Sequence, residues 1–189
     1  MDTQQAYRSL QLQDYPHAPW WLDQVSGPAS WQCVQTEDKA GRITGLLPFQ
    51  IKRRWGMSMI VPPALSPRLG PILFPVAEFD IRAYQSFAFR TLTTLSEQLP
   101  RVAYARIQWP YELTYGLPWQ LAGWQQTVRY SYVLDLQQTS ETPAQHWRKD
   151  QRHRLQRAQK DLQIHPTTDW RPVWELLQAT FVRQGKNFP

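Results

Sequence analysis

Apolar and polar residues alternate with a period of two in several short runs of this chain, a pattern typical of half-buried strands. The clearest run spans residues 128–136, with Arg129 on its polar face and apolar side chains at every second position, namely Val128, Tyr130, Tyr132, Leu134 and Leu136. Similar runs predict further strands at residues 31–37, 42–51, 57–61 and 101–109. The turn Asp38-Lys39-Ala40-Gly41 joins the first two as a hairpin.

Apolar residues spaced by three and four predict the helices. The longest helix covers residues 77–99, and its apolar stripe consists of Ile81, Tyr84, Ala88, Leu92, Leu95 and Leu99. Thr142-Pro143 predicts the start of a helix that runs to Leu162, because threonine can cap and proline suits the first helical position. Shorter helices are expected at residues 18–25 and 117–122, and a last one from near Asp169 to near Gly185.

These elements predict an α/β (α+β) fold, in which helices flank a mixed, mostly antiparallel sheet. Residues 1–17 form a loosely held lead-in, residues 18–136 a first half, and residues 137–189 a basic helix with the helix after it. Residues 163–167 can add a short strand between those two helices.

Prolines constrain two places in the first half. Pro48 cannot donate a hydrogen bond to a neighbouring strand, so its strand is expected to be bulged or at an edge there. Residues 62–71 contain so many prolines that they predict a stiff loop. This loop either lines a substrate site, with Arg68 as an anion contact, or is a rigid connector.

The composition is that of a globular protein, with 42% hydrophobic and 19% charged residues in a chain of 189. The single cysteine, Cys33, rules out an internal disulfide framework, and burial in a strand is favoured over a reactive thiol. Residues 1–13 lack the apolar segment of a secretory signal, and the uncharged run at residues 55–67 is too short to span a bilayer. A cytoplasmic protein without a membrane span is expected.

The net charge of +6 comes mainly from one segment, because residues 148–160 contain six basic residues and one acidic residue. Arg148 and Arg152 lie four residues apart and therefore on one side of the predicted helix, where they could bind a phosphate or carboxylate. A solvated basic face is the alternative interpretation.

Motifs for several kinds of catalysis are absent. The four histidines show no metal-ligand spacing, so no metal is expected, and the chain has no P-loop, no Gly-x-Gly-x-x-Gly and no Gly-x-Ser-x-Gly. Most of the ten tryptophans fall on core positions of strands or helices; Trp109, before Pro110 at the end of a predicted strand, is the exception and a candidate substrate contact.

Two segments carry a resemblance to a known family. The helical turn at residues 117–122, followed by Gly123-Trp124 and a strand ending in Tyr132-Val133-Leu134-Asp135-Leu136, resembles the closing segment of a GNAT-type acyltransferase domain. The segment Trp147–Lys160 resembles the helix that opens the second half of FemAB-like proteins, which carry two GNAT-like halves in tandem. By this resemblance residues 18–136 are the first half, and residues 137–189 begin the second half of a longer pattern, either in a truncated member or with the rest supplied by another chain.

The resemblance implies transfer of an acyl or aminoacyl group to an amine on a small molecule or peptide. The donor would be acyl-CoA or aminoacyl-tRNA, which makes tRNA a possible partner, and no catalytic base can be named. Five residues are candidates for contacts with substrate or anions: Arg68, Trp109, Arg129, Arg148 and Arg152. GNAT-type enzymes hold the pyrophosphate of CoA on a glycine-containing turn between a central strand and the next helix. Residues 109–115, where that turn is expected, contain Pro110 and no glycine, so this half is expected to be incomplete alone.

A binding module without enzymatic activity is the alternative function, with the helix at residues 143–162 contacting nucleic acid or an acidic partner. Both C-terminal helices also carry apolar residues that need to be covered, and a symmetric homodimer is one way to cover them.

Overall fold

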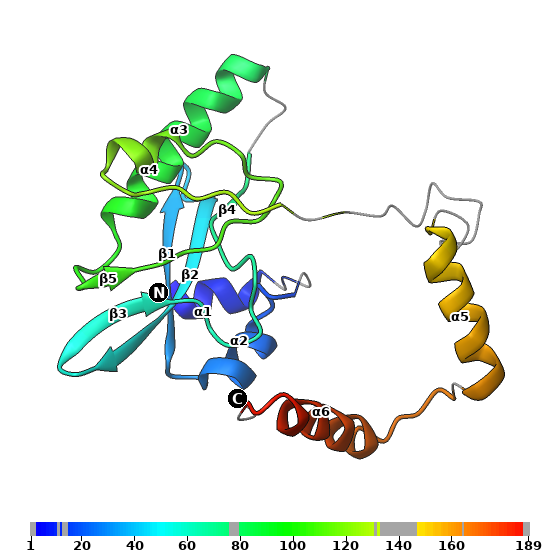
Figure 1. Ribbon diagram of the computed structural model, residues 1–189. Coiled ribbons are helices and arrows are strands. Elements are labelled where there is room, and N and C mark those ends of the chain that lie inside the picture. Colours follow the sequence, from blue (N-terminus) through cyan, green and yellow to red (C-terminus); the bar gives the residue numbers. More distant parts are fainter. Residues whose placement is uncertain are drawn as a thin grey trace. The chain divides into compact units, whose positions relative to one another are not determined.

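The computed structural model describes residues 3–10, 12, 15–75, 80–130, 132, 147–163 and 165–186. The chain divides into two compact units, Met1–Val128 and Arg129–Pro189. In chain order, the described elements of the first unit are α1 (Thr3–Ser9), α2 (Pro19–Ser26), β1 (Trp31–Glu37), β2 (Ile43–Arg54), β3 (Met57–Val61), β4 (Ile72–Leu73), α3 (Ile81–Glu97), β5 (Tyr104–Ala105) and α4 (Leu117–Leu121) (Figure 1). Those of the second unit are α5 (Lys149–Asp161) and α6 (Arg171–Arg183).

A mixed, mostly antiparallel sheet organises the first unit. Its strands follow the order β1-β2-β3-β5, and β4 pairs separately with β2. Each described pairing is antiparallel except that of β3 with β5, and the chain passes from β3 to β5 through α3. A parallel pair needs such a crossover connection. The predicted α/β fold, with helices flanking a mixed sheet, is therefore confirmed.

The central strand β2 is covered on both of its faces. On one face, Leu46 belongs to a buried cluster with Trp31 of β1 and with Tyr7 and Leu22 of the first two helices. On the other face, Leu47 belongs to a second cluster, whose remaining buried members come from α3 and α4 and are Ala88, Leu92, Leu95 and Trp119. Because neighbouring strand residues point to opposite faces, the core has two layers.

Helix α3 lies close to β2 at Gly45. A Cβ placed on this glycine would lie 2.4 Å from Cγ2 of Thr91 and 2.9 Å from Oγ1 of Thr36. Real Cβ atoms do not approach other atoms so closely, so only glycine allows the observed distance between helix and strand.

Helix α3 was predicted at residues 77–99 and begins in the structure at Ile81; residues 77–79 lie outside the described part. The Asp80 carboxylate caps it by accepting a 2.7 Å hydrogen bond from the backbone N–H of Ala83. The centre of the predicted stripe is buried, but Ile81 is 78% exposed because the first turn has no layer to pack against among the described residues.

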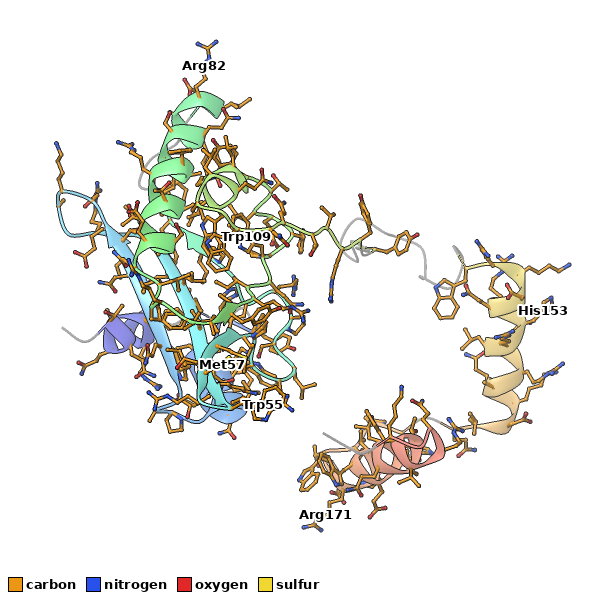
Figure 2. The ribbon with its side chains drawn as sticks, turned by 60° about the vertical axis from the view of Figure 1, so that its left-hand side comes forward. Trp55, Met57, Arg82, Trp109, His153 and Arg171 are labelled. Carbon is orange, nitrogen blue, oxygen red and sulfur yellow. The ribbon has the colours of Figure 1, made fainter. Side chains whose placement is uncertain are left out.

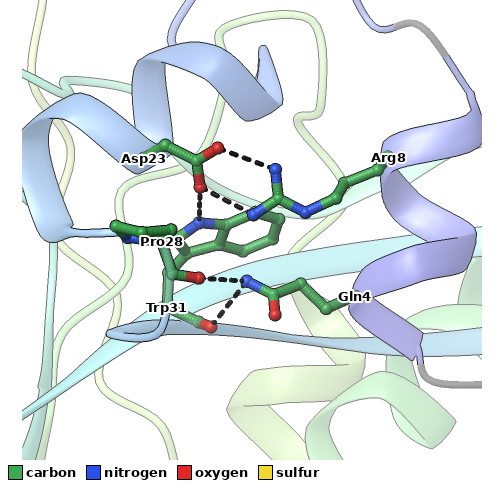
Figure 3. A network of polar contacts seen from close by, with 5 residues as sticks. All are labelled: Gln4, Arg8, Asp23, Pro28 and Trp31. Atoms are coloured by element: carbon green, nitrogen blue, oxygen red, sulfur yellow. Dashed lines mark hydrogen bonds and ion pairs between the residues drawn. The ribbon is translucent and has the colours of Figure 1, made fainter.

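The described residues of the segment 1–17 pack against the fold, which corrects the loose lead-in predicted there. Tyr7 of α1 is fully buried, and its hydroxyl donates a 2.7 Å hydrogen bond to the carbonyl oxygen of His17. Figure 3 shows a further link, in which Asp23 of α2 accepts hydrogen bonds from Arg8 of α1 and from the indole of Trp31. Polar side chains thus connect α1, α2 and β1. Such contacts cannot be predicted from the periodicity of hydrophobic residues.

Pro48 pairs with Cys33 of β1, and the only register shift in that described pairing lies elsewhere, between Thr36 and Glu37. On the other side of β2, β4 pairs with residues 45–46 and β3 with residues 50–54. Pro48 falls between those two pairings. Of the two predicted alternatives, the local edge is therefore confirmed, and β2 has no bulge at Pro48.

Three predicted strands differ from the structure. The strand expected at residues 101–109 is reduced to the two residues of β5, because β3 pairs with it only at Met59 and Ile60. The described residues of the segment 128–136, which are 128–130 and 132, have no regular structure, and Tyr130 is 94% exposed. The rest of that segment lies outside the described residues. The described residues of the segment 163–167 are likewise irregular.

These two segments have no neighbouring strand in the part of the chain that the structure describes. A strand needs such a partner for its backbone hydrogen bonds, so alternation of side chains alone does not produce one. In the second unit, α5 and α6 follow the predicted helices, but α5 begins only at Lys149. Trp147 and Arg148, which were predicted as helical, precede it, and residues 143–146 are not described. Among the described helices, none is both long and apolar enough to cross a bilayer.

Candidate functional site

The proline-rich loop at residues 62–71 is held by three side chains from the N-terminal segment. The Tyr15 hydroxyl donates a hydrogen bond to the carbonyl oxygen of Leu65, and Nε1 of Trp21 donates one of 2.8 Å to Oγ of Ser66. Nε2 of His17 lies 3.3 Å from the carbonyl oxygen of Gly70. These contacts, together with the prolines, fix the loop in one conformation.

Two residues of this loop have unusual backbone conformations. Leu65 has a φ of 55° and Arg68 a φ of 68°, in the left-handed region that residues other than glycine rarely adopt. Such a conformation costs on the order of 1 kcal/mol or more and persists only where the surroundings enforce it. The strain at Arg68 is therefore a direct result of how firmly the loop is held.

The loop at residues 106–115 packs closely against the proline-rich loop. A Cβ on Gly70 would lie 2.8 Å from Cα of Trp109 and 2.9 Å from the carbonyl oxygen of Gln108, so the two backbones meet where only glycine fits. This approach places Arg68 next to Tyr111, with Cζ of the guanidinium 5.6 Å from the centre of the ring. The structure thus brings Arg68 and Trp109, both predicted from the sequence, into one pair of loops.

Arg68 has the properties of an anion contact. Its side chain is half-exposed, and it has no carboxylate partner among the described residues. An arginine can form two parallel hydrogen bonds with a carboxylate or phosphate, and stacking on an aromatic ring orients its planar group. The loop pair could therefore bind an anionic group at its surface.

Trp109 has a different role in this arrangement. Its ring packs edge-on against Trp119, with the ring centres 5.3 Å apart. Trp119 is buried, donates a 3.0 Å hydrogen bond to the carbonyl oxygen of Leu92, and also contacts the ring of Trp124 at 4.6 Å. Trp109 therefore packs against the buried Trp119 and connects the loop pair to α3 through it.

The other three candidates, Arg129, Arg148 and Arg152, belong to the second unit. Arg129 is exposed in a segment without regular structure. Arg148 precedes α5, and its carbonyl oxygen accepts a 3.1 Å hydrogen bond from the N–H of Arg152. Both side chains are exposed, and α5 has no buried residue among those described.

A metal site and a reactive thiol are two other features typical of a catalytic centre. No group of three or more histidine, cysteine or acidic side chains is placed to hold a metal ion in this part of the chain. Cys33 is buried in β1, and burial raises the pKa of its thiol to about 12. At neutral pH this thiol is therefore not a nucleophile.

A further group of charged and aromatic residues was not identified in the sequence. Lys52, Arg53 and Arg54 end β2, and Trp55 and Gly56 form the turn to β3. All five are exposed. The signal was a Lys-Arg-Arg run next to Trp-Gly between two apolar strands, which the larger basic cluster in α5 concealed.

Comparisons of the chain with protein-family models, with curated proteins and with solved structures find no match. The function is therefore inferred from the residues and their geometry.

Proposed function

We propose that this chain supplies a non-catalytic, substrate-binding half of an N-acyltransferase with FemAB-like, GNAT-type architecture. In this proposal, Arg68 binds a carboxylate of the amine substrate, a small molecule or peptide. One observation carries the proposal: the Arg68 guanidinium lies next to the ring of Tyr111. The loop that holds it there has a strained backbone and is fixed by hydrogen bonds from other segments.

The arrangement of the sheet supports a GNAT-like half. The resemblance implies a mixed, mostly antiparallel sheet with helices on it. The order β1 to β4, then α3, then β5, which is parallel to β3, agrees with that description. The loops that carry Arg68 and Tyr111 follow β3 and β5, so the candidate site lies at the ends of the two parallel strands. Ligands commonly bind at such strand ends in α/β proteins.

A second observation supports the non-catalytic role. By the resemblance, the pyrophosphate of CoA would be held by backbone N–H groups of a glycine-containing turn at residues 109–115, between β5 and α4. This segment contains no glycine, and Pro110 has no N–H to donate. It therefore lacks backbone donors that such a turn would offer to CoA.

The reaction implied by the resemblance is attack of the amine nitrogen on the carbonyl carbon of a thioester or aminoacyl ester. A C–N bond forms, the C–S or C–O bond breaks, and a base removes the proton from the amine. We assign none of the described residues as that base. The role of this half is to hold the amine substrate through its anionic group, so that the amine is oriented toward the donor.

Isothermal titration of the full chain with alanyl-alanine and with its C-terminal amide tests this proposal. The amide retains the amine but lacks the carboxylate. We expect the free acid to bind about tenfold or more tightly than the amide, since hydrogen bonds to charged groups contribute about 1.5–3 kcal/mol. Arg68→Ala should remove this difference. The control Lys39→Ala deletes an exposed cation on the β1–β2 turn and should retain it.

Acetyl-CoA forms the second part of the same titration. We expect no saturable binding of acetyl-CoA, because residues 109–115, where the CoA turn is expected, contain Pro110 and no glycine. Equal binding of acid and amide by the wild-type chain, or saturable binding of acetyl-CoA, would contradict the proposal.

A further inference from the structure

The hairpin formed by β2 and β3 extends beyond the rest of the sheet. The pairing of β1 with β2 ends at Trp31 and Gln50, so residues 51–54 of β2 pair only with β3 among the described strands. On its other side, β3 pairs with β5 at Met59 and Ile60 and not nearer the turn. The N–H of Ala103, just before β5, still bonds to the carbonyl oxygen of Ser58 at 3.0 Å. Residues 53–57 are therefore a two-stranded tip, visible as the free end of the hairpin in Figure 1.

The turn at this tip has a tryptophan at a position where its backbone conformation is unfavourable. Trp55 has a φ of 51° and Gly56 a φ of 75°, the combination of a two-residue type I′ turn. Asparagine or glycine normally occupies the first position, because a bulky side chain is strained there. Packing does not compensate for the strain, since Trp55 is 79% exposed. Figure 2 labels Trp55 and Met57 at this end of the hairpin. The ring is thus displayed to solvent at a cost in stability, which points to a role in binding.

The tip also carries unpaired positive charge. Lys52, Arg53 and Arg54 are exposed, and none of them forms an ion pair within the part of the chain that the structure describes. The surrounding sequence does not neutralise them, because there is no acidic residue between Asp38 and Glu78. Phosphate groups are natural partners for such a cluster.

The register of the hairpin distributes these cations over both faces. Lys52 lies opposite Met59 and Arg54 opposite Met57, whereas Arg53 lies opposite Ser58 on the other face. Tyr104 of β5 pairs with Met59, is 52% exposed and thus adds a second aromatic residue to the face of Lys52 and Arg54. A chain of phosphates passing the tip would meet a cation on either side.

Arg54 also contacts the ring of Trp55. Its guanidinium lies 4.2 Å from the centre of the Trp55 ring, a cation–π contact that covers part of the ring while leaving most of the side chain in solvent. Aromatic rings of this kind stack on the unpaired bases of single strands, and neighbouring cations bind the phosphates.

We propose that the tip of the β2–β3 hairpin is a binding site for single-stranded nucleic acid. One base stacks on Trp55, and the phosphates beside it contact Lys52, Arg53 and Arg54. A membrane surface fits this tip less well, because only Trp55 and Met57 could enter the apolar layer and cations flank them on both faces. This site is independent of the Arg68 loop pair, so either proposal can fail without the other.

Fluorescence anisotropy with labelled 12-nucleotide oligouridine and oligothymidine tests the site in the full chain. Both strands should bind at low salt, and three phosphate contacts predict a slope of log affinity against log salt of about −2. Tighter binding of oligouridine would indicate RNA as the ligand, and tighter binding of oligothymidine would indicate DNA.

Trp55→Asn is the decisive variant, because Asn-Gly is a favoured pair for this turn and should keep or raise the melting temperature. We expect it to weaken oligonucleotide binding about tenfold or more, as loss of a stacked base does, without changing the salt slope. The triple variant Lys52→Ala, Arg53→Ala, Arg54→Ala should reduce the slope toward zero. The matched control Lys149→Ala, Arg157→Ala, Lys160→Ala in α5 should bind as the wild type does.

Three results would overturn the proposal. The first is unchanged affinity in Trp55→Asn. The second is loss of binding only in the α5 variant, which would place the nucleic-acid site on that helix. The third is flotation with anionic vesicles that depends on Trp55, without binding of either oligonucleotide, which would identify the tip as a membrane contact.

Discussion

Arg8 and Asp23 are joined by two hydrogen bonds of 2.7 Å, from Nη1 to Oδ2 and from Nη2 to Oδ1. This bidentate ion pair links α1 to α2, and the same carboxylate accepts a 2.9 Å hydrogen bond from Nε1 of Trp31 in β1. The guanidinium also lies 5.2 Å from the centre of the Trp31 ring. One carboxylate therefore connects three elements, and its protonation state matters for the N-terminal part of the fold.

The contribution of Asp23 to stability should depend on pH. The hydrogen bonds from Arg8, and secondarily the one from Trp31, hold the pKa of Asp23 below its usual value. A carboxyl group whose pKa is lowered by folding stabilises the protein above its unfolded pKa, and that stabilisation is lost as the pH falls through the folded pKa. We expect the wild type to be more stable than Asp23→Asn at about pH 6 and this advantage to shrink below about pH 4. Urea unfolding of both proteins across this range measures it; an advantage that stays constant would contradict the prediction.

Truncation of Leu92 should be costly. The side chain is fully buried between α3 and β2, so Leu92→Ala should lower the free energy of unfolding by about 2–5 kcal/mol. Ile81→Ala removes an apolar side chain from the same helix at a position that is 78% exposed. Denaturant unfolding should show little change for this control. Similar losses of unfolding free energy in both variants would contradict the buried position of Leu92 and the exposed position of Ile81.

Gly45 should tolerate no side chain unless Thr91 is shortened. Gly45→Ala introduces a Cβ 2.4 Å from Cγ2 of Thr91, and overpacking of this kind typically costs about 1–3 kcal/mol. Thr91→Ser removes that methyl group. Thermal unfolding of the double variant should therefore recover part of the loss, although the approach to Oγ1 of Thr36 remains. Additive effects of the two substitutions would show that the Cβ does not meet Thr91.

Local patterns predicted much of the fold. The bounds of β1 and β3 are as the alternation of side chains predicts, and α4 ends before Gly123, which has a φ of 88°. Strand periodicity failed at Tyr130, because a strand also depends on a partner that the local sequence does not contain. The burial of Tyr7 was missed for a related reason, since the contacts that hold α1 come from distant residues.

The candidate site was only partly predictable. The prolines around Arg68 indicated a stiff loop, but its contact with Tyr111 depends on the close approach of Gly70 to Trp109, which no local pattern contains. Trp109 was identified from its position at a strand end, and its ring instead packs against Trp119. The pair of loops is thus a result of tertiary packing rather than of any motif.

Amide and indole NMR chemical shifts of the full chain, recorded during titration with alanyl-alanine, test the Arg68 site most directly. Binding at the loop pair should shift the signals of residues 65–70 and 109–113 and leave those of β1 unchanged, and Arg68→Ala should abolish the shifts. Shifts that arise elsewhere, or that persist in Arg68→Ala, would show that this loop pair is not a binding site for the dipeptide.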